Sequence, residues 1–204
     1  SPMADLVQAF YDAIPPSFNI TFDKASPVGL GPLRVTLTAN KSLAQTPAVT
    51  VQFQGRPSTL FTVTNTALYN YEGTINVNSF MPSGLAQFNI SAEDMYGNTF
   101  NGPPFGPSLI LDVSPPNGVV STVPRAPIQT TNSVNLTVSL QLTEAAKSGT
   151  TPTLNFTPPV GAPMPVTVAG TGPNWTGTLA LTPAMGSGIG HFSLTVADPL
   201  DNVG

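Results

Sequence analysis

Apolar and polar residues alternate with a period of two along much of the chain. Segments 34–39, 49–53, 74–78 and 88–92 place apolar side chains at every second position. Successive side chains of a β-strand point to opposite faces, so this pattern predicts strands with one buried and one solvent-facing side. Such segments recur about every ten residues, with Gly, Pro and Asn between them. That spacing favours a β-sandwich over a barrel or a parallel α/β sheet.

The chain repeats itself with an offset of 104 residues. Tyr71–Ile75 aligns with Trp175–Leu179, and Phe88–Asp94 aligns with Phe192–Asp198, without a gap. One-residue slips extend the match upstream, pairing Val63 with Val166, Phe53 with Phe156, and Val35–Leu37 with Leu136–Val138. Self-similarity of this kind indicates two copies of one structural unit.

Three short motifs mark the copies: T-P-x-V-T-V at Thr46–Val51, [YW]-x-G-T at Tyr71 and Trp175, and a D-x-x-G-N turn at Asp94–Asn98. The second copy has Asp198–Asn202, with Asp in place of Gly, at that turn. With these motifs the chain resembles the bacterial and archaeal immunoglobulin-like repeats found in tandem within large surface and secreted proteins. The resemblance implies an all-β fold of two tandem immunoglobulin-like β-sandwich domains, extracellular or on the cell surface.

The phase of the repeat predicts the domain limits. We expect an N-terminal strand or linker over residues 1–16, a first domain over 17–113 and a second over 114–204. Ser108–Val113 fits the last strand of the first domain, and Ser114–Pro116 fits a stiff linker. The second copy has no such strand after its turn, so we expect the second domain to lack its last strand.

Residues 7–12, followed by Pro15 and Pro16, resemble the last strand and linker of a domain. One interpretation is that the sequence is a piece of a longer array. Another is that residues 3–14 complete the second domain of a neighbouring copy by strand addition, with Leu6, Val7, Phe10 and Tyr11 as the assembly residues. A third is a local helix, because these residues and Ile14 also suit one helical face.

Charge and composition exclude several classes of partner. Charged residues make up 8% of the chain, with six Lys and Arg against ten Asp and Glu. Six basic residues cannot form the cationic surface that nucleic acids or anionic membranes require. No apolar run approaches the length of a membrane span, so we expect no membrane insertion. The absence of cysteine excludes disulfides, thiol catalysis and Cys-ligated zinc.

The residue types that carry catalysis are not shared by the two copies. The one histidine, His191, aligns with Gln87, and Glu72 and Glu93 align with Thr176 and Ala197. Glu144 completes the set of carboxylates considered for glycosidic cleavage. No serine lies in a G-x-S-x-G elbow. We therefore expect a chain that is not an enzyme and has no cofactor.

Asp94 and Asp198 recur, and the turn explains them. An Asp side chain bonds to the backbone ahead of it, and Gly97 or Asp201 can adopt the left-handed conformation that the turn needs. A weaker hypothesis is a calcium site near the linker, formed by Glu93, Asp94 and Asp112 with Asn98.

Two further surface features are candidates. Six sequons occur, at Asn19, Asn40, Asn89, Asn135, Asn155 and Asn174; they are possible N-glycosylation sites in a Thr-rich strand protein. Tyr71 and Trp175 are candidates for sugar-stacking platforms, but their place at a strand start favours packing in the core.

Three functions fit these observations. The first is a structural spacer or stalk in a prokaryotic surface or secreted protein, with neighbouring immunoglobulin-like domains as partners. The second is a filament or pilus subunit assembled from copies of itself by donor-strand complementation through residues 3–14. The third is an adhesin domain that binds carbohydrate or a surface receptor.

Overall fold

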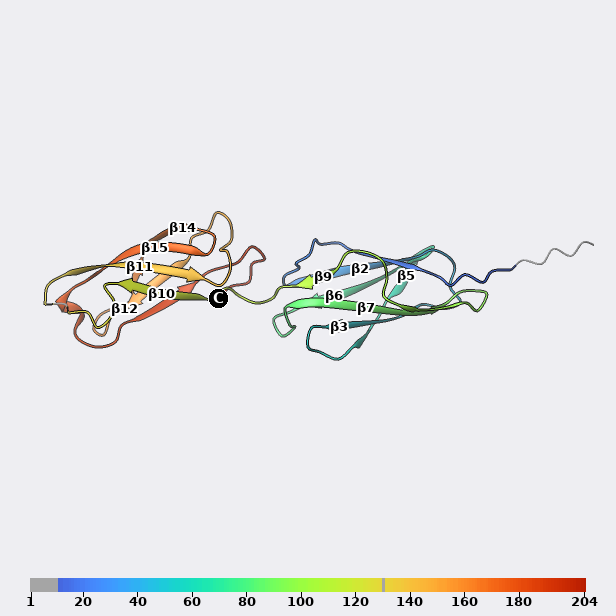
Figure 1. The fold of residues 1–204 in the computed structure, drawn as a ribbon, viewed down its shortest axis with the longest axis horizontal. Helices are drawn as coiled ribbons and strands as arrows, with labels where there is room; N and C mark the ends of the chain where they lie inside the picture. Colours follow the sequence, from blue (N-terminus) through green and yellow to red (C-terminus); the bar gives the residue numbers. More distant parts are fainter. Residues whose placement is uncertain (1–10, 130) are drawn as a thin grey trace, which may run out of the picture. The chain divides into compact units, whose positions relative to one another are not determined.

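The computed structural model describes residues 11–129 and 131–204, and the described residues are all-β (Figure 1). They form two compact units, unit 1 (Ser1–Asp112) and unit 2 (Val113–Gly204). This division lies one residue from the boundary expected at 113 and 114. All ladders between strands are antiparallel, and the one short helix described is a 3-10 turn at Pro183–Met185.

Unit 1 contains two antiparallel sheets. The strands of the first, in spatial order, are β1 (Phe18–Phe22), β2 (Gly31–Ala39), β6 (Asn70–Val77) and β5 (Thr64–Ala67). Those of the second are β4 (Thr59–Phe61), β3 (Ala48–Phe53), β7 (Gly84–Glu93) and β8 (Thr99–Gly102), and β9 (Leu109–Leu111) also pairs with β7. The sheets pack face to face, with ring centroids 5.4 Å apart for Phe18 and Phe100 and 6.0 Å apart for Phe22 and Phe88.

Unit 2 repeats this arrangement with fewer strands. One sheet has the order β10 (Gly118–Val123), β11 (Val134–Leu142), β15 (Asn174–Leu181) and β14 (Val168–Thr171). The other has the order β13 (Met164–Val166), β12 (Thr153–Thr157) and β16 (His191–Thr195). Each strand has its counterpart in unit 1, but β8 and β9 have none among the described strands of unit 2.

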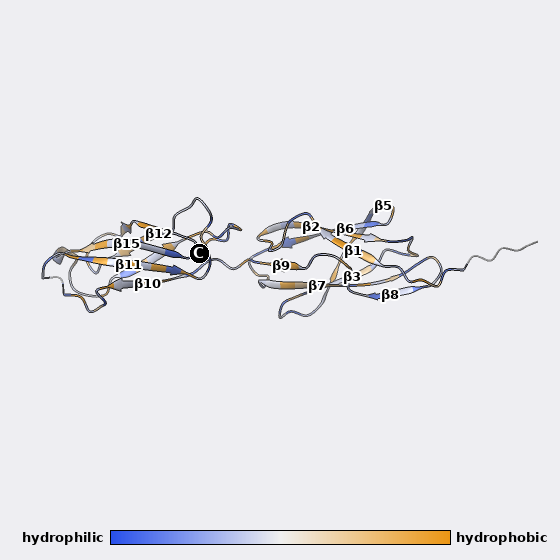
Figure 2. Ribbon diagram, turned by 45° about the horizontal axis from the view of Figure 1, so that its top comes forward, coloured by the Kyte–Doolittle hydropathy of each residue, from blue (hydrophilic) through white to orange (hydrophobic). Residues whose placement is uncertain are grey.

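Alternation of side chains explains why these segments form sandwich strands. In β2, Leu33, Val35, Leu37 and Ala39 are buried, and the residues between them face outward. In β11, Leu136, Val138, Leu140 and Leu142 are buried in the same way. Figure 2 shows hydrophobic and hydrophilic residues alternating along the strands. Burial of one face of each sheet against the other supplies most of the free energy that favours folding.

The structure corrects the upstream alignment of the two copies. Tyr71 pairs with Leu37, and Trp175 pairs with Leu140, so Leu37 corresponds to Leu140 and not to Val138. In the other sheet, Phe88 pairs with Val51 and Phe192 pairs with Phe156. The predicted pairings of Phe53 with Phe156 and of Val63 with Val166 are likewise two residues out of register. A two-residue shift keeps every side chain on its predicted face, so the sequence pattern cannot detect it.

Most residues of the hypotheses for the N-terminal segment lie outside the part of the chain that the structure describes. These include the assembly residues Leu6, Val7 and Phe10. Tyr11 is described, and its side chain is 85% exposed. Residues 11–17 form neither a helix nor a strand.

Candidate functional site

A network of charged and polar side chains in unit 1 is built on the turn that follows β7. The Asp94 side chain is 0% exposed, and its Oδ1 accepts hydrogen bonds from the backbone N–H groups of Tyr96 and Asn98, both at 2.9 Å. Asn98 Nδ2 donates to Asp94 Oδ2 at 3.0 Å. Gly97 has φ 87°, a conformation that glycine adopts without the clash of a Cβ atom. Asp94 therefore closes the turn, as the sequence predicts.

The turn after β16 in unit 2 has the same bonding. Asp198 Oδ1 accepts from the N–H groups of Leu200 and Asn202, both at 2.8 Å, and Asn202 Nδ2 donates to Oδ2 at 2.7 Å. Asp201 has φ 66°, so it takes the left-handed conformation that Gly97 has in unit 1. The recurrence of both aspartates is thus explained by turn geometry.

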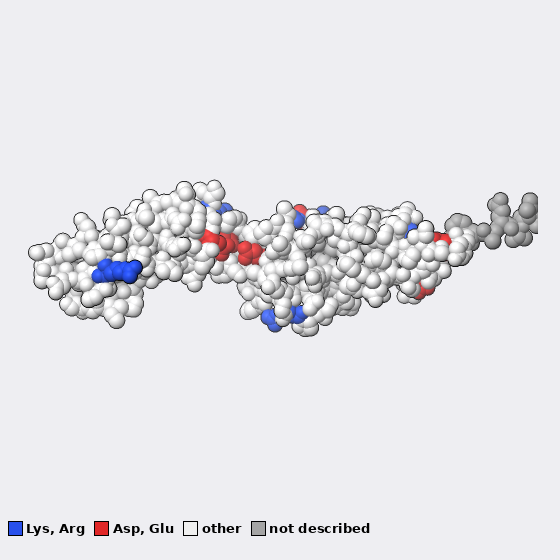
Figure 3. All heavy atoms as spheres, in the orientation of Figure 1, with Lys and Arg blue, Asp and Glu red and all other residues white. Residues whose placement is uncertain are grey.

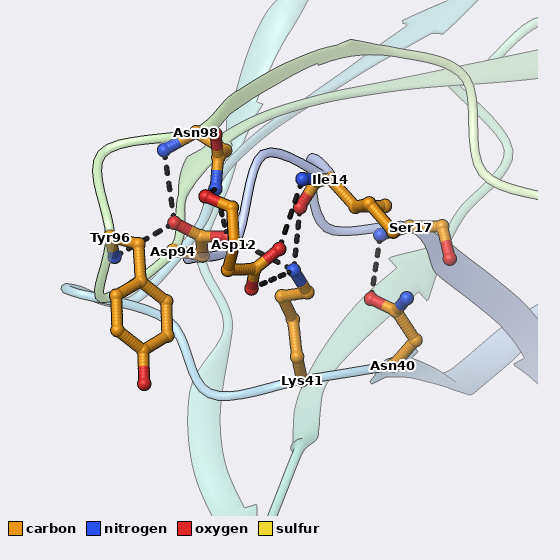
Figure 4. A network of polar contacts seen from close by, with 8 residues as sticks. All are labelled: Asp12, Ile14, Ser17, Asn40, Lys41, Asp94, Tyr96 and Asn98. Atoms are coloured by element: carbon orange, nitrogen blue, oxygen red, sulfur yellow. Dashed lines mark hydrogen bonds and ion pairs between the residues drawn. The ribbon is translucent and has the colours of Figure 1, made fainter. Parts of the chain in front are cut away.

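In unit 1 this turn also holds the segment that leads into β1 (Figure 4). Lys41, just after β2, has its Nζ 2.7 Å from Asp12 Oδ2 and 3.1 Å from Asp94 Oδ2. Lys41 Nζ also donates to the Ile14 carbonyl oxygen, and Asn98 Nδ2 donates to the Asp12 carbonyl oxygen at 3.1 Å. One ammonium group therefore joins the incoming segment to the end of the second sheet.

The charges in this network stabilise one another. The hydrogen bond to Lys41 lowers the pKa of Asp12 and raises that of Lys41. Burial alone would raise the pKa of the Asp94 carboxyl, but hydrogen bonds from Asn98, Tyr96 and Lys41 outweigh it and hold this pKa well below its ordinary value. The network is therefore charged at neutral pH, with two carboxylates sharing one ammonium group.

The position of Lys41 carries the opposite charge in unit 2. The strand register makes Glu144 its counterpart, and carboxylate oxygens of Glu144 and Asp198 lie within 4.8 Å of each other. The ion pair is therefore not part of the design that the two units share. No local sequence pattern marks Lys41, because its partners lie 29 and 53 residues away along the chain.

The residues of the calcium hypothesis do not come together within unit 1. Glu93, Asp94 and Asn98 lie at the C-terminal end of β7. Asp112 follows β9, which pairs with Gly84–Ala86 at the other end of β7. A ten-residue strand spans about 30 Å, so Asp112 cannot share an ion with the other three residues.

The other candidate residues lie in ordinary strand positions. His191 and its counterpart Gln87 are exposed, Glu72 is half-buried and Glu93 is exposed. Tyr71 and Trp175 are each 6% exposed, so their rings pack in the cores and offer no stacking platform. Trp175 Nε1 donates to the Gly172 carbonyl oxygen at 3.0 Å.

Of the six sequon asparagines, five are exposed and Asn155 is half-buried. Side-chain hydrogen bonds hold Asn40 and Asn89: Asn40 Oδ1 accepts from the Ser17 N–H, and Asn89 Nδ2 donates to Asn101 Oδ1. Figure 3 shows that the face in view is mostly uncharged, in keeping with the composition.

Comparisons with known proteins assign no family. No family model matches the chain, and no curated protein does. A DUF4785 family protein from Legionella pneumophila is similar in structure at a TM-score of 0.38 and 11% sequence identity, covering 88% of this chain and 46% of its own. A marsupial T cell receptor has a TM-score of 0.34 and 10% identity, covering 83% of this chain and 87% of its own. The chain thus spans about half of the first protein's length. Among the described residues, none of the helices is long and apolar enough to cross a membrane.

Proposed function

We propose that this chain is a structural spacer of two immunoglobulin-like β-sandwich repeats in a prokaryotic surface or secreted protein, and that it bears mechanical load without catalysis. The resemblance to tandem immunoglobulin-like repeats supports the location outside the cell. The observation that carries the proposal is the way in which the first and last segments of unit 1 are bonded to each other.

These two segments run parallel and share backbone hydrogen bonds at two places. Near β1, Ile20 N–H donates to Phe105 O at 2.7 Å, and Phe105 N–H donates to Phe18 O at 2.8 Å. Near β9, Val28 N–H donates to Ile110 O at 2.8 Å, and Asp112 N–H donates to Val28 O at 2.9 Å. The bridges between Asn19 and Phe105 and between Val28 and Leu111 are both parallel.

Parallel end segments resist extension well. When the two ends of unit 1 are pulled apart, these segments slide past each other, so their hydrogen bonds are loaded together and must break together. Antiparallel end segments would open one bond at a time. A buried donor or acceptor that loses its hydrogen-bond partner before water replaces it costs more free energy than the bond contributes to folding. This cost raises the barrier to unfolding under force.

The comparison of the two units supports a structural role over a chemical one. Packing residues recur at equivalent positions, as in Leu37 and Leu140 or Tyr71 and Trp175. Groups that carry chemistry differ, as in Gln87 and His191 or Lys41 and Glu144. A repeat with a structural role needs the same packing residues in each copy, whereas its reactive residues can vary.

Single-molecule force spectroscopy on the 204-residue chain tests this function. We expect an unfolding event for unit 1 that releases about 300 Å of chain, from roughly 95 residues at about 3.5 Å each. Ser26→Ala removes the Oγ that accepts from the Ile110 N–H at 2.7 Å and is expected to lower that unfolding force. Ser42→Ala changes an exposed serine of the same unit and serves as the control. Extension of unit 1 without a force peak would contradict a load-bearing role.

A glycan array separates this function from the adhesin alternative. A spacer binds none of the glycans through either unit, whereas saturable binding of a defined glycan would favour an adhesin.

A further inference from the structure

The last strand of unit 1 fills a slot between two other segments. β9 pairs with Gly84–Ala86 at the start of β7, and on its other side it bonds to Val28 and to Ser26 Oγ. Leu109 and Leu111 point into the core and are each 1% exposed, whereas Ile110 between them is 44% exposed. β9 thus contributes two buried side chains and closes one edge of the second sheet.

Unit 2 has the walls of this slot but, among its described residues, no strand inside it. The counterparts of Ser26–Val28 and Gly84–Ala86 are Ala126–Ile128 and Gly188–Gly190. Both line a groove of about 330 Å³ in unit 2. Its floor is formed by core side chains: Leu136, Phe156, Leu181, Met185 and Phe192. The groove therefore lies where unit 1 places its last strand.

The strand beside the groove is less covered than its counterpart. In β7, Phe88 and Ile90 are 8% and 0% exposed. Their equivalents in β16, Phe192 and Leu194, are only half-buried. Among the described strands, β12 alone pairs with β16, whereas β7 has β3 on one edge and both β8 and β9 on the other. Backbone N–H and C=O groups on an open edge, next to apolar side chains, favour addition of a strand.

The chain carries a second segment that matches β9. Asp12, Pro15 and Pro16 have the spacing of Asp112, Pro115 and Pro116, and both Pro16 and Pro116 are buried. This match places Tyr11 at the position of Leu111, Phe10 at that of Ile110 and Ala9 at that of Leu109. Tyr11 is 85% exposed, whereas the matching residue Leu111 is 1% exposed, so the Tyr11 ring lacks the core contacts that Leu111 makes. Tyr11 cannot make these contacts in unit 1, because β9 already occupies the slot there.

We propose that residues 7–11 of a second copy of this chain bind in the groove of unit 2 as an added β-strand. Tyr11 and Ala9 enter the groove, Phe10 faces solvent, and the backbone pairs with the free edge of β16. The network of Asp12, Lys41 and Asp94 holds the donor strand at a fixed point on its own unit 1. Donor and acceptor are different surfaces, so the contact is head-to-tail and joins copies into open chains or rings. This inference does not rest on the spacer function.

Sedimentation velocity and light scattering of the full chain over a range of concentrations test the proposal. We expect oligomers that grow with concentration and that are lost in Tyr11→Asp, because a carboxylate cannot enter the apolar groove. Phe10→Asp is the matched control, since the outward position tolerates the charge and oligomers persist. Continuing the chain after Gly204 with residues 101–113 supplies the strand within one molecule and is expected to abolish oligomers as well.

Hydrogen exchange with an added peptide tests strand binding without a substitution that could disturb folding of the chain. Synthetic peptide 1–16, added to a chain that lacks residues 1–10, is expected to slow exchange of the β16 amides, and the Tyr11→Asp peptide is not. A chain that stays monomeric at every concentration, or oligomers that survive Tyr11→Asp, would overturn the proposal. Either result leaves the unfolding force of unit 1 untouched, so failure here is distinct from failure of the spacer function.

Discussion

Among the described strands, the second sheet of unit 2 has an open edge at β16, whereas the matching strand β7 of unit 1 is covered. Truncating one core-facing side chain in each strand compares how much unfolding free energy that side chain contributes. Ile90 is 0% exposed and packs beside Val49, which is also 0% exposed. Ile90→Ala therefore leaves a closed cavity, and we expect unit 1 to lose about 3 kcal/mol of its free energy of unfolding. Leu194 is half-buried at an open edge, so Leu194→Ala loses about half of the transfer free energy and leaves no closed cavity. We expect a loss of about 1 kcal/mol for unit 2.

Urea unfolding resolves the two losses when it is measured in the Tyr11→Asp background, in which no second copy covers the edge of β16. Trp175 is the only tryptophan and lies in the core of unit 2, so its fluorescence follows that unit alone. Pulsed hydrogen exchange of β7 peptides at each urea concentration follows unit 1. With a slope of about 1.5 kcal/mol per molar urea, the midpoints should fall by about 2 M for Ile90→Ala and by about 0.7 M for Leu194→Ala.

Ser193→Ala, at an exposed position of β16, is the control and should shift the Trp175 transition by less than about 0.5 kcal/mol. A Leu194→Ala loss as large as that of Ile90→Ala would mean that β16 is covered as fully as β7. The reasoning from an open edge would then be wrong.

Two further predictions concern pH and backbone packing. The lowered pKa values of Asp12 and Asp94 stabilise unit 1 above about pH 3.8, and this contribution is lost as pH falls through their folded-state pKa values. In Lys41→Met the folded-state pKa values of the two carboxyls lie closer to their ordinary value, so the unfolding midpoint of unit 1 should fall by less over the same pH range. The raised pKa of Lys41 acts in the other direction, so its contribution is lost only as pH rises beyond 10.5. Gly177→Ala would place a Cβ atom 2.3 Å from the Thr167 carbonyl oxygen and should cost unit 2 about 1–3 kcal/mol in the Trp175 transition. Gly102→Ala, where the nearest side-chain atom is 3.5 Å away, should leave the unit 1 midpoint unchanged, and equal losses would refute the steric argument.

Local features of this fold could be predicted from the sequence. Period-two alternation identified the strands and the face that each one buries, as in β2 and β11. The turns at Asp94 and Asp198 followed from side chains that bond within four residues along the chain. These features depend on neighbours in sequence, so the residues themselves carry the information.

Long-range features could not be predicted. The candidate site around Lys41 joins residues from three distant segments, and no local pattern marks it. The calcium hypothesis grouped Asp112 with Asp94 near the linker, but pairing of β9 with the start of β7 puts the two residues at opposite ends of β7.

By itself, the sequence determined that the chain is a repeated antiparallel β-protein with few charges, because side-chain alternation and turn chemistry act over a few residues. Only the tertiary structure decided the register between the copies and the state of the last sheet edge. A shift of two residues leaves every inward side chain inward, so pairing with the neighbouring strand must choose among such registers. The covering of an edge likewise depends on a strand from elsewhere in the chain, which β7 has in β9 and which β16 has in none of the described strands.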